Sequence, residues 1–412
     1  MMKKSHFSSL LAVGGLLLGM AFVPSLVSCS DDDNDKTSSE VVGSDNPAVY
    51  ISDPAKLAMI RSMTDLDGTG RIYEIDYTAD YQLQQVIDRG ATDLKPMFSY
   101  IASLLYDNLS PSPLRVQYGA GCSAFAAPTP DGDFLMGRNY DFRHSDSTKA
   151  RGRFYVPTCA IVVHTAPVGG KRSVSMVDGF NLGFGQGFYR NDSTDLSMLM
   201  GLPYAALDGI NEDGFAIGVL ALHEKQTNQQ TGKKRIGTTT AIRMLLDRVS
   251  TVKEAVNMLR DYDMDMRGQG TSNYHFFMAD ATGDYAIVEY TTPKGGCEPS
   301  QMEVFTGNDT SRCVTNFYVS PTMVGTTDGW GSQHGRWRYD SLRVNLLANN
   351  YVLKENAAWK LLQLVSQPPT QEITSQTQWS ALYNLTEKNM NLSILREYAK
   401  KYSFKVKKTK KK

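Results

Sequence analysis

The chain has 412 residues, of which 41% are hydrophobic and 10% aromatic, so it can form one large domain or two small ones. Lys and Arg together number 43, as do Asp and Glu, which gives a formal net charge of zero at pH 7. This balance excludes the strong positive charge typical of proteins that bind nucleic acids or other polyanions. The one basic run, at residues 407–412, is typical of a solvated chain end.

The N-terminus has the features of an export signal. Two lysines precede an apolar stretch at residues 10–23, which is too short to span a bilayer. The stretch ends in Leu26-Val27-Ser28-Cys29, which resembles a bacterial lipobox, where the cysteine receives lipid. We therefore predict that residues 1–28 are a lipoprotein signal peptide and that Cys29 anchors the protein to a membrane. The alternative is an ordinary signal peptide with an incidental cysteine.

An acidic run follows the predicted anchor, from Ser30 to Asp35. Such a run is usually a solvated tether, and residues 29–46 are predicted to be one. The run also resembles the signal that sends some bacterial lipoproteins to the outer face of the outer membrane. We expect the protein in the cell envelope, attached to the outer membrane, with exposure at the cell surface as a further possibility.

The next segment, residues 47–121, has a helical pattern. Apolar residues recur at helical spacing within residues 93–108, so one face of that helix is apolar. A shorter helix is expected at residues 81–87, and two prolines at 111 and 113 end the pattern.

From residue 122 onward, strand and helix patterns alternate in blocks. The turn at residues 128–133 predicts a hairpin between two short strands. The order of the blocks predicts a layered α+β fold with antiparallel sheets. The expected strands are 124–127, 134–137, 154–165, 174–177, 216–222, 274–280, 285–290, 378–384 and 390–394, and the expected helices are 239–249, 252–262, 338–348 and 355–365.

The five cysteines have different surroundings. No CxxC pair or Cys/His spacing indicates zinc, and the six histidines are scattered, so no metal or other cofactor is expected. Cys159 lies in an apolar run typical of a core strand, whereas Cys297 and Cys313 could pair in an oxidising compartment. Cys122 follows the small residues Gly119-Ala120-Gly121, which allow the backbone to fold tightly around a sulfur atom.

The predicted hairpin groups residues that carry chemistry. Its first strand begins near Cys122, and its second strand returns Arg138 and Asp141 to the same end. A nucleophile, a cation and a carboxylate are therefore expected close together.

This spacing resembles the start of the choloylglycine hydrolase family of N-terminal-nucleophile amidases. The family includes bile salt hydrolases, penicillin V acylases, acid ceramidase and N-acylethanolamine acid amidase. Further segments resemble family motifs in the same order. These are Asp208-Gly209-Ile210-Asn211-Glu212-Asp213-Gly214-Phe215, Asp280-Ala281-Thr282-Gly283 with Ala286-Ile287-Val288-Glu289, Val314-Thr315-Asn316, Gly335-Arg336-Trp337 and Thr377-Gln378-Trp379.

The resemblance implies a four-layer αββα sandwich at residues 122–394, within a catalytic domain at residues 122–412 that follows a helical pro-region at residues 47–121. It also implies a small-molecule N-acyl amide as substrate, either a fatty-acyl amide or a conjugated bile acid. Cleavage of the Gly121–Cys122 bond would expose Cys122 as the nucleophile, with Gly121 allowing a strained turn. The cleaved pro-region would either leave or stay bound.

The resemblance also implies a role for each site residue. The α-amine of Cys122 would act as general base, because its ordinary pKa is about 8. Asp141 would orient that amine, and Arg138 would lower the pKa of the thiol. Asn316 would stabilise the oxyanion, and Arg336 would complete the polar floor by holding Asp141. A surface position is the alternative for Arg336.

Two departures from the family remain. The long pro-region resembles the ceramidase-like and acyltransferase-like branches rather than the bile salt hydrolases. Ala221 occupies the position where bile salt hydrolases carry an oxyanion Asn. Two alternatives to an amidase are therefore kept, an acyltransferase of the same fold and a catalytically inactive surface lipoprotein that binds ligands.

Overall fold

The computed structural model describes residues 46–90, 94–107, 121–144, 159–222, 226–267, 273–292, 299–327, 329, 335–369 and 376–406. They belong to one compact unit that extends from Val41 to Lys412. The predicted signal peptide and Cys29 lie outside the described residues. Within the described part of the chain, no helix is both long enough and apolar enough to cross a membrane.

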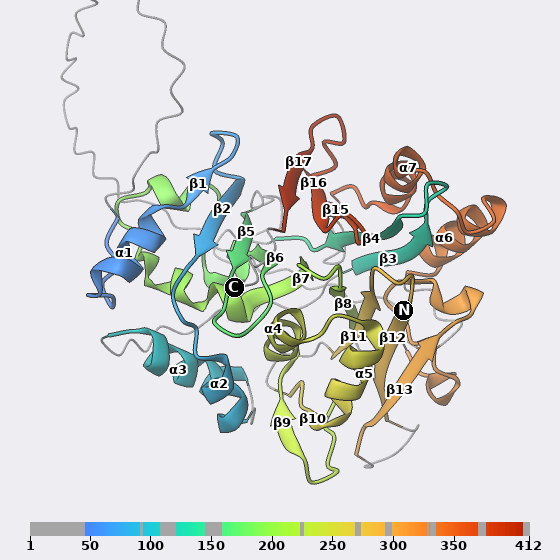
Figure 1. Ribbon diagram of the computed structural model, residues 1–412, viewed down its shortest axis with the longest axis horizontal. Coiled ribbons are helices and arrows are strands. Elements are labelled where there is room, and N and C mark those ends of the chain that lie inside the picture. Colours follow the sequence, from blue (N-terminus) through green and yellow to red (C-terminus); the bar gives the residue numbers. More distant parts are fainter. Residues whose placement is uncertain are drawn as a thin grey trace, which may run out of the picture. The chain divides into compact units, whose positions relative to one another are not determined.

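Two large sheets form the centre of this unit (Figure 1). The first has the order β1-β2-β5-β6-β7-β8-β11-β12-β13. Its strands are β1 (Thr64–Asp65), β2 (Ile72–Tyr77), β5 (Ala160–Thr165), β6 (Ser173–Asp178), β7 (Ala206–Asn211), β8 (Ala216–Leu222), β11 (Asn273–Ala279), β12 (Tyr285–Thr291) and β13 (Gln301–Thr306). All neighbours in it pair antiparallel except β2 and β5, which are parallel.

The second sheet has the order β14-β3-β4-β15-β16-β17 and is antiparallel throughout. Its strands are β14 (Cys313–Val314), β3 (Gly121–Pro128), β4 (Phe134–Asp141), β15 (Thr377–Asn384), β16 (Asn389–Ile394) and β17 (Tyr402–Lys405). A small parallel pair, β9 (Lys234–Ile236) and β10 (Tyr262–Met264), lies apart from both sheets in the pairing.

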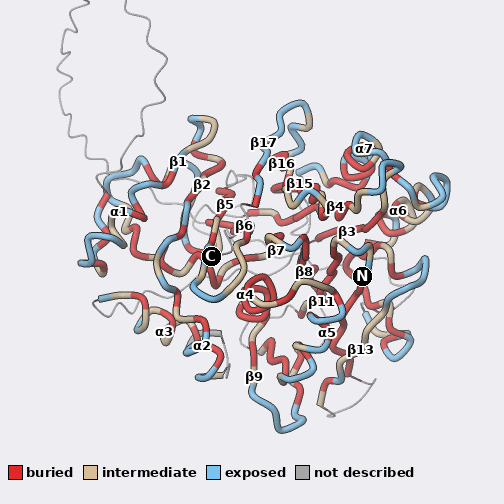
Figure 2. The backbone as a smooth tube through the Cα atoms, in the orientation of Figure 1, coloured by how far each residue is buried: buried red, intermediate tan, exposed pale blue. Residues whose placement is uncertain are grey.

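Burial shows how the layers stack. In β8, Ala216 and Leu220 pack into a core shared with the second sheet, whereas Ile217 and Val219 pack into a core shared with helices. This alternation is expected of a strand covered on both faces. Figure 2 shows the resulting buried strands in red at the centre.

Helices cover both outer faces. Those against the first sheet are α1 (Pro54–Arg61), α2 (Leu83–Arg89), α3 (Leu94–Leu105), α4 (Thr238–Arg248) and α5 (Val252–Arg260), together with the 3₁₀ segments η1 (Gly179–Leu182), η2 (Phe188–Arg190) and η3 (Leu196–Ala205). Those against the second sheet are α6 (Arg336–Ala348) and α7 (Glu355–Val365). Two short 3₁₀ segments, η4 (Asp309–Ser311) and η5 (Pro321–Met323), flank β14. The predicted four-layer αββα sandwich is therefore confirmed.

The segment before residue 121 is not purely helical, in contrast to the prediction. Strand β2 pairs with β5 at six consecutive positions, from Ile72 opposite Ala160 to Tyr77 opposite Thr165. The N-terminal segment thus continues the first sheet and shares its core. The strand was missed because the whole segment was assigned a helical period.

Candidate active site

Cys122 is the second residue of β3 and lies opposite Tyr140 of β4. Its side chain belongs to the core between the two sheets and is 1% exposed. The Arg138 guanidinium donates to its Sγ, with 3.9 Å between Nη2 and Sγ. The backbone N–H of Asp141 also hydrogen-bonds the thiol. The hairpin therefore brings the three residues together, as its spacing predicts.

A buried carboxylate accompanies Arg138. Asp208 of β7 forms an ion pair with the guanidinium, and both side chains are fully buried. Asp208 also accepts hydrogen bonds from Tyr383 and from Trp379, the latter at 3.1 Å. Asp208 was recognised in a sequence motif but was not assigned a site role, because only the fold brings β7 against β4.

Strand β8 leaves room for the arginine. Arg138 Nη2 donates to the Val219 carbonyl at 2.7 Å. A Cβ atom on Gly218 would lie 2.7 Å from both Cδ and Nε of Arg138. Glycine is therefore needed at this position for the Arg138 side chain to pass this close to the backbone of β8.

Burial raises the pKa of the Cys122 thiol above its usual value, and the charges of Arg138 and Arg338 oppose that rise. Burial also raises the pKa of Asp208, and Arg138 opposes this shift in turn. The charge of Arg138, taken by itself, lowers the pKa of the Cys122 thiol, as predicted. The net shift in this uncleaved chain is upward, because desolvation outweighs the cation.

The backbone of Cys122 has its own polar partners. Its N–H donates to Asn316 Oδ1 at 2.6 Å. The Arg338 guanidinium, on the first turn of α6, donates to the Cys122 carbonyl and to the same Asn316 Oδ1, the latter at 2.8 Å. Gly335 precedes α6 with φ of 69°, and a Cβ there would lie 3.0 Å from Arg338 Nη2. The two peptide groups on either side of the Cys122 Cα are thus each contacted by a side chain.

Asp141 closes the site at the end of β4. Its carboxylate accepts from Thr377 Oγ1 at 2.6 Å and from Gln367 Nε2 at 3.0 Å. Arg338 Nη1 lies 3.7 Å from its Oδ2. Burial raises the pKa of Asp141 to about 6, although Arg338 and these hydrogen bonds oppose the rise.

The assignment of Arg336 was wrong, because the structure places Arg338 beside Asp141. Arg336 pairs with Asp340 one turn along α6, with 2.9 Å between Nε and Oδ2, and its side chain is partly exposed. Successive helical residues are 100° apart, so residues two apart face opposite sides of a helix. The exposed Trp337 between them gives no sign of which arginine points inward.

Asn316 has contacts beyond its predicted role. Its Nδ2 donates to the Ala221 carbonyl at 2.8 Å, and its Oδ1 accepts from Cys122 N. In this uncleaved chain Asn316 therefore holds the Cys122 nitrogen, and its part as an oxyanion donor stays a prediction. Gly121, for which a strained turn was expected, lies in the extended strand β3 opposite Asp141.

A further polar group beside Cys122 was missed from the sequence. The hydroxyl of Tyr140 donates to Asp178 Oδ2 at 3.0 Å, and His144 Nε2 lies 2.7 Å from the same oxygen. The His144 ring stacks on Phe180 with centroids 4.3 Å apart. All three polar side chains are buried, and Tyr140 lies opposite Cys122 in the strand pairing, so this group packs beside the thiol.

Two other cysteines that the structure describes lie outside this group of residues. Cys159 and Cys313 are buried free thiols, and Cys297 lies outside the described residues. Among the residues that the structure describes, no group of His, Cys, Asp or Glu could hold a metal ion.

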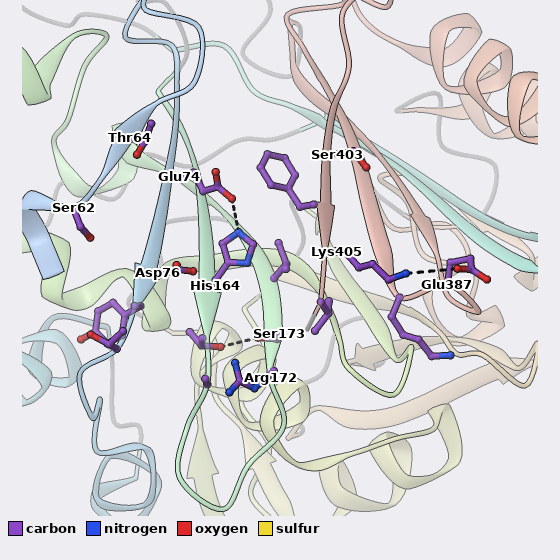
Figure 3. A pocket seen from close by; sticks show the side chains of 18 of the residues that line it. Ser62, Thr64, Glu74, Asp76, His164, Arg172, Ser173, Glu387, Ser403 and Lys405 are labelled. Carbon is purple, nitrogen blue, oxygen red and sulfur yellow. Dashed lines mark hydrogen bonds and ion pairs between the residues drawn. The ribbon is translucent and has the colours of Figure 1, made fainter. Parts of the chain in front are cut away.

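A cleft of about 1130 Å³ lies elsewhere, between the β2–β5–β6 region and β17 (Figure 3). Its lining includes the ion pair of His164 with Glu74 and the side chain of Phe404. Cys122 does not line it.

Two inner sheets between helical layers, with a cysteine at the start of a central strand, define the architecture of the N-terminal-nucleophile hydrolases. The chain belongs to the acyl-coenzyme A:6-aminopenicillanic acid acyl-transferase family, whose model matches residues 128–333. This match confirms the family resemblance drawn from the motifs. The matched region contains Arg138, Asp141 and Asn316 and begins after Cys122.

Solved structures with similarity to the chain include a mutant of the conjugated bile acid hydrolase from Clostridium perfringens. The two sequences are 16% identical, the match covers 69% of this chain and 92% of the hydrolase chain, and the TM-score is 0.44. The penicillin V acylase from Agrobacterium tumefaciens is 17% identical to this chain. The match covers 66% of this chain and 83% of the acylase chain, with a TM-score of 0.42. Comparison with curated proteins gave no match.

Proposed function

We propose that the protein is an amidase that hydrolyses N-acyl amides through Cys122, after cleaving its own Gly121–Cys122 bond. One observation carries the proposal. The thiol, the backbone nitrogen and the backbone carbonyl of Cys122 are each contacted by a buried polar side chain, from Arg138, Asn316 and Arg338 respectively. A structural cysteine has no need of all three partners.

Cleavage begins with attack of the Cys122 sulfur on the Gly121 carbonyl carbon. The peptide C–N bond breaks, the Cys122 nitrogen takes a proton and becomes an amine, and Gly121 is left in a thioester. Water then hydrolyses the thioester, which frees the thiol and leaves a carboxylate on Gly121. Asn316 already accepts a hydrogen bond from the nitrogen that leaves, so it holds the amine as it forms.

Turnover uses the same groups on a substrate. The new α-amine takes the proton of the thiol, and the thiolate adds to an amide carbonyl. The substrate amine leaves with a proton, and water hydrolyses the acyl-thioester. Arg138 stabilises the thiolate by its charge, and Asp208 holds the guanidinium in place.

Acyl transfer is the second candidate, because the family that the chain belongs to is described by such a reaction. An amine acceptor would then replace water at the acyl-thioester. The two reactions are distinguished by their products when an N-acyl amide is incubated with a second amine. A new N-acyl product indicates transfer, and free acid alone indicates hydrolysis.

The mass of the purified protein tests the cleavage. We expect two fragments separated before Cys122, and a single uncleaved chain for Cys122→Ala. A panel of fatty-acyl and bile-acid amides then tests turnover. A cleaved protein with a free Cys122 amine that leaves the whole panel intact would refute the amidase and favour the ligand-binding alternative.

We also propose that the N-terminal fragment stays bound after cleavage. Strand β2 pairs with β5 along its whole length, and Tyr77 donates to the Met200 carbonyl at 2.8 Å. Arg71 forms an ion pair with Glu397 at 2.7 Å. Each fully buried apolar side chain adds roughly 1.5–3 kcal/mol. The fragments should therefore co-elute in native gel filtration and separate only in denaturant.

Export as a lipoprotein is the last part of the proposal and rests on the lipobox-like sequence before Cys29. Cys29→Ala should release the protein from the membrane fraction of the producing cells. Equal membrane attachment of this variant would refute the anchor.

A further inference from the structure

The segment that carries Asn316 has little strand pairing of its own. It follows the two-residue strand β14 and continues through residues 315–320 without regular structure. Side chains of the first sheet hold it instead. Glu289 of β12 accepts from the backbone N–H groups of Val319 and Ser320, at 2.9 and 3.0 Å. On the neighbouring strand β11, His275 Nε2 lies 2.8 Å from the Thr315 carbonyl.

The ring of His275 lies between two oxygen atoms. The Thr315 carbonyl can only accept a hydrogen bond, so Nε2 donates to it. Nδ1 lies 3.0 Å from Oε1 of Glu289. The fully buried His275 therefore joins Glu289 to the Thr315 carbonyl.

Two charged residues lie near this pair and the segment it holds. Glu303 lies directly opposite Glu289 on β13 and accepts from Ser320 Oγ at 2.9 Å. Like charges directly opposite one another destabilise a sheet, so the hydrogen bonds that these two carboxylates accept from the segment matter for its position. Arg338 reaches Asn316 from α6. The strand neighbour of His275 on β8 is the apolar Leu220.

We propose that the hydrogen-bonded pair of His275 and Glu289 positions the segment that carries Asn316, so that Asn316 points at the Cys122 nitrogen. The Thr315 carbonyl belongs to the same peptide plane as the Asn316 N–H, so fixing one fixes the other. Asn316 in turn holds the nitrogen that cleavage releases and that later serves as the base. The inference rests on the proposed function, since it assigns His275 and Glu289 a part in that reaction without contact with the substrate.

Nitrogen NMR of the histidine rings in the uncleaved Cys122→Ala protein tests this hydrogen bond without any activity. We expect Nε2 of His275 to carry a proton, with the ring signal assigned through the backbone of the uniformly labelled protein. A His275 ring with a bare Nε2 would overturn the inference, even if proteins substituted at His275 or Glu289 failed to fold.

Kinetics test the positioning. His275→Gln and Glu289→Gln should each slow self-cleavage and lower kcat about 10- to 100-fold, because small displacements of reacting groups have effects of that size. KM should stay nearly constant. The double substitution should cost little more than either single one, since both remove the same interaction.

A matched control is available in the cleft of Figure 3. His164 on β5 pairs with Glu74 on β2 at 2.8 Å, and neither strand neighbours β11, β12 or β14, so His164→Gln removes a partly exposed His–Glu pair from another part of the fold. It should leave both rates unchanged. Failure of the proposed amidase would appear as absent turnover in the unsubstituted protein. Failure of this inference would appear as a His275 ring with a bare Nε2 or as rates unaffected by the two substitutions.

Discussion

Replacing Asp141 with Asn should change how stability depends on pH. Burial raises the pKa of this carboxyl from 3.8 to about 6. The folded state therefore binds the proton more tightly than the unfolded state does. The neutral carboxyl contributes stability that is fully present below the unfolded pKa and is lost as the pH rises through the folded one.

The size of the effect follows from the shift. About two pKa units correspond to about 3 kcal/mol, because one unit is worth about 1.4 kcal/mol. Roughly 2 kcal/mol of this is lost between pH 4.5 and pH 8, since part of the change occurs below that window. Asn has nearly the same shape and does not ionise, so Asp141→Asn removes the loss.

The assay is urea unfolding of Cys122→Ala and of Cys122→Ala with Asp141→Asn, each at pH 4.5 and pH 8. The shared background keeps both proteins uncleaved, and other titrating groups cancel in the difference. The Asn protein should gain about 2 kcal/mol relative to its parent on going to pH 8. An equal pH dependence in the two proteins would refute the raised pKa.

Three other outcomes follow from the site. Arg338→Lys should stop or strongly slow self-cleavage, because one ammonium group cannot replace the guanidinium that reaches two acceptors. Arg336→Lys is the control and should cleave normally. Gel analysis of the freshly purified proteins distinguishes the cleaved from the uncleaved chain. Asp208→Asn leaves Arg138 buried without its counter-charge and should lower the free energy of unfolding by about 3–5 kcal/mol, measured in urea. Turnover should decline as the pH falls below about 6, because the neutral Asp141 no longer orients the Cys122 amine as a carboxylate. A flat profile of turnover from pH 5 to pH 8 would contradict this role of Asp141.

Local patterns predicted much of the fold. The turn at residues 128–133 correctly predicted the hairpin of β3 and β4, because proline and glycine restrict the backbone there. The helix expected at residues 252–262 is α5, which Thr251 caps by accepting from the Glu254 N–H at 3.2 Å. Strand β2 escaped prediction because its pairing with β5 joins segments that are distant in sequence.

In the candidate site, too, local patterns predicted some residues and missed those that come from distant parts of the chain. Cys122, Arg138 and Asp141 share one hairpin, so their spacing was enough to group them. Asp208 and Arg338 reach the group from β7 and α6, through contacts that only the packed layers create. No local pattern in the sequence distinguishes the inward arginine of α6 from the outward one two residues earlier.

The pairing of β2 with β5 has a consequence for the cleaved protein. Residues 160–165 of β5 are mostly apolar, and without β2 they would form an unpaired sheet edge, which readily recruits strands from other molecules. In the proposed cleaved protein, the N-terminal fragment would therefore keep this edge covered and oppose aggregation after the peptide bond is cut. Once processed and unfolded, the protein would need two separate chains to meet again, so its refolding should depend on concentration, whereas that of the uncleaved chain should not.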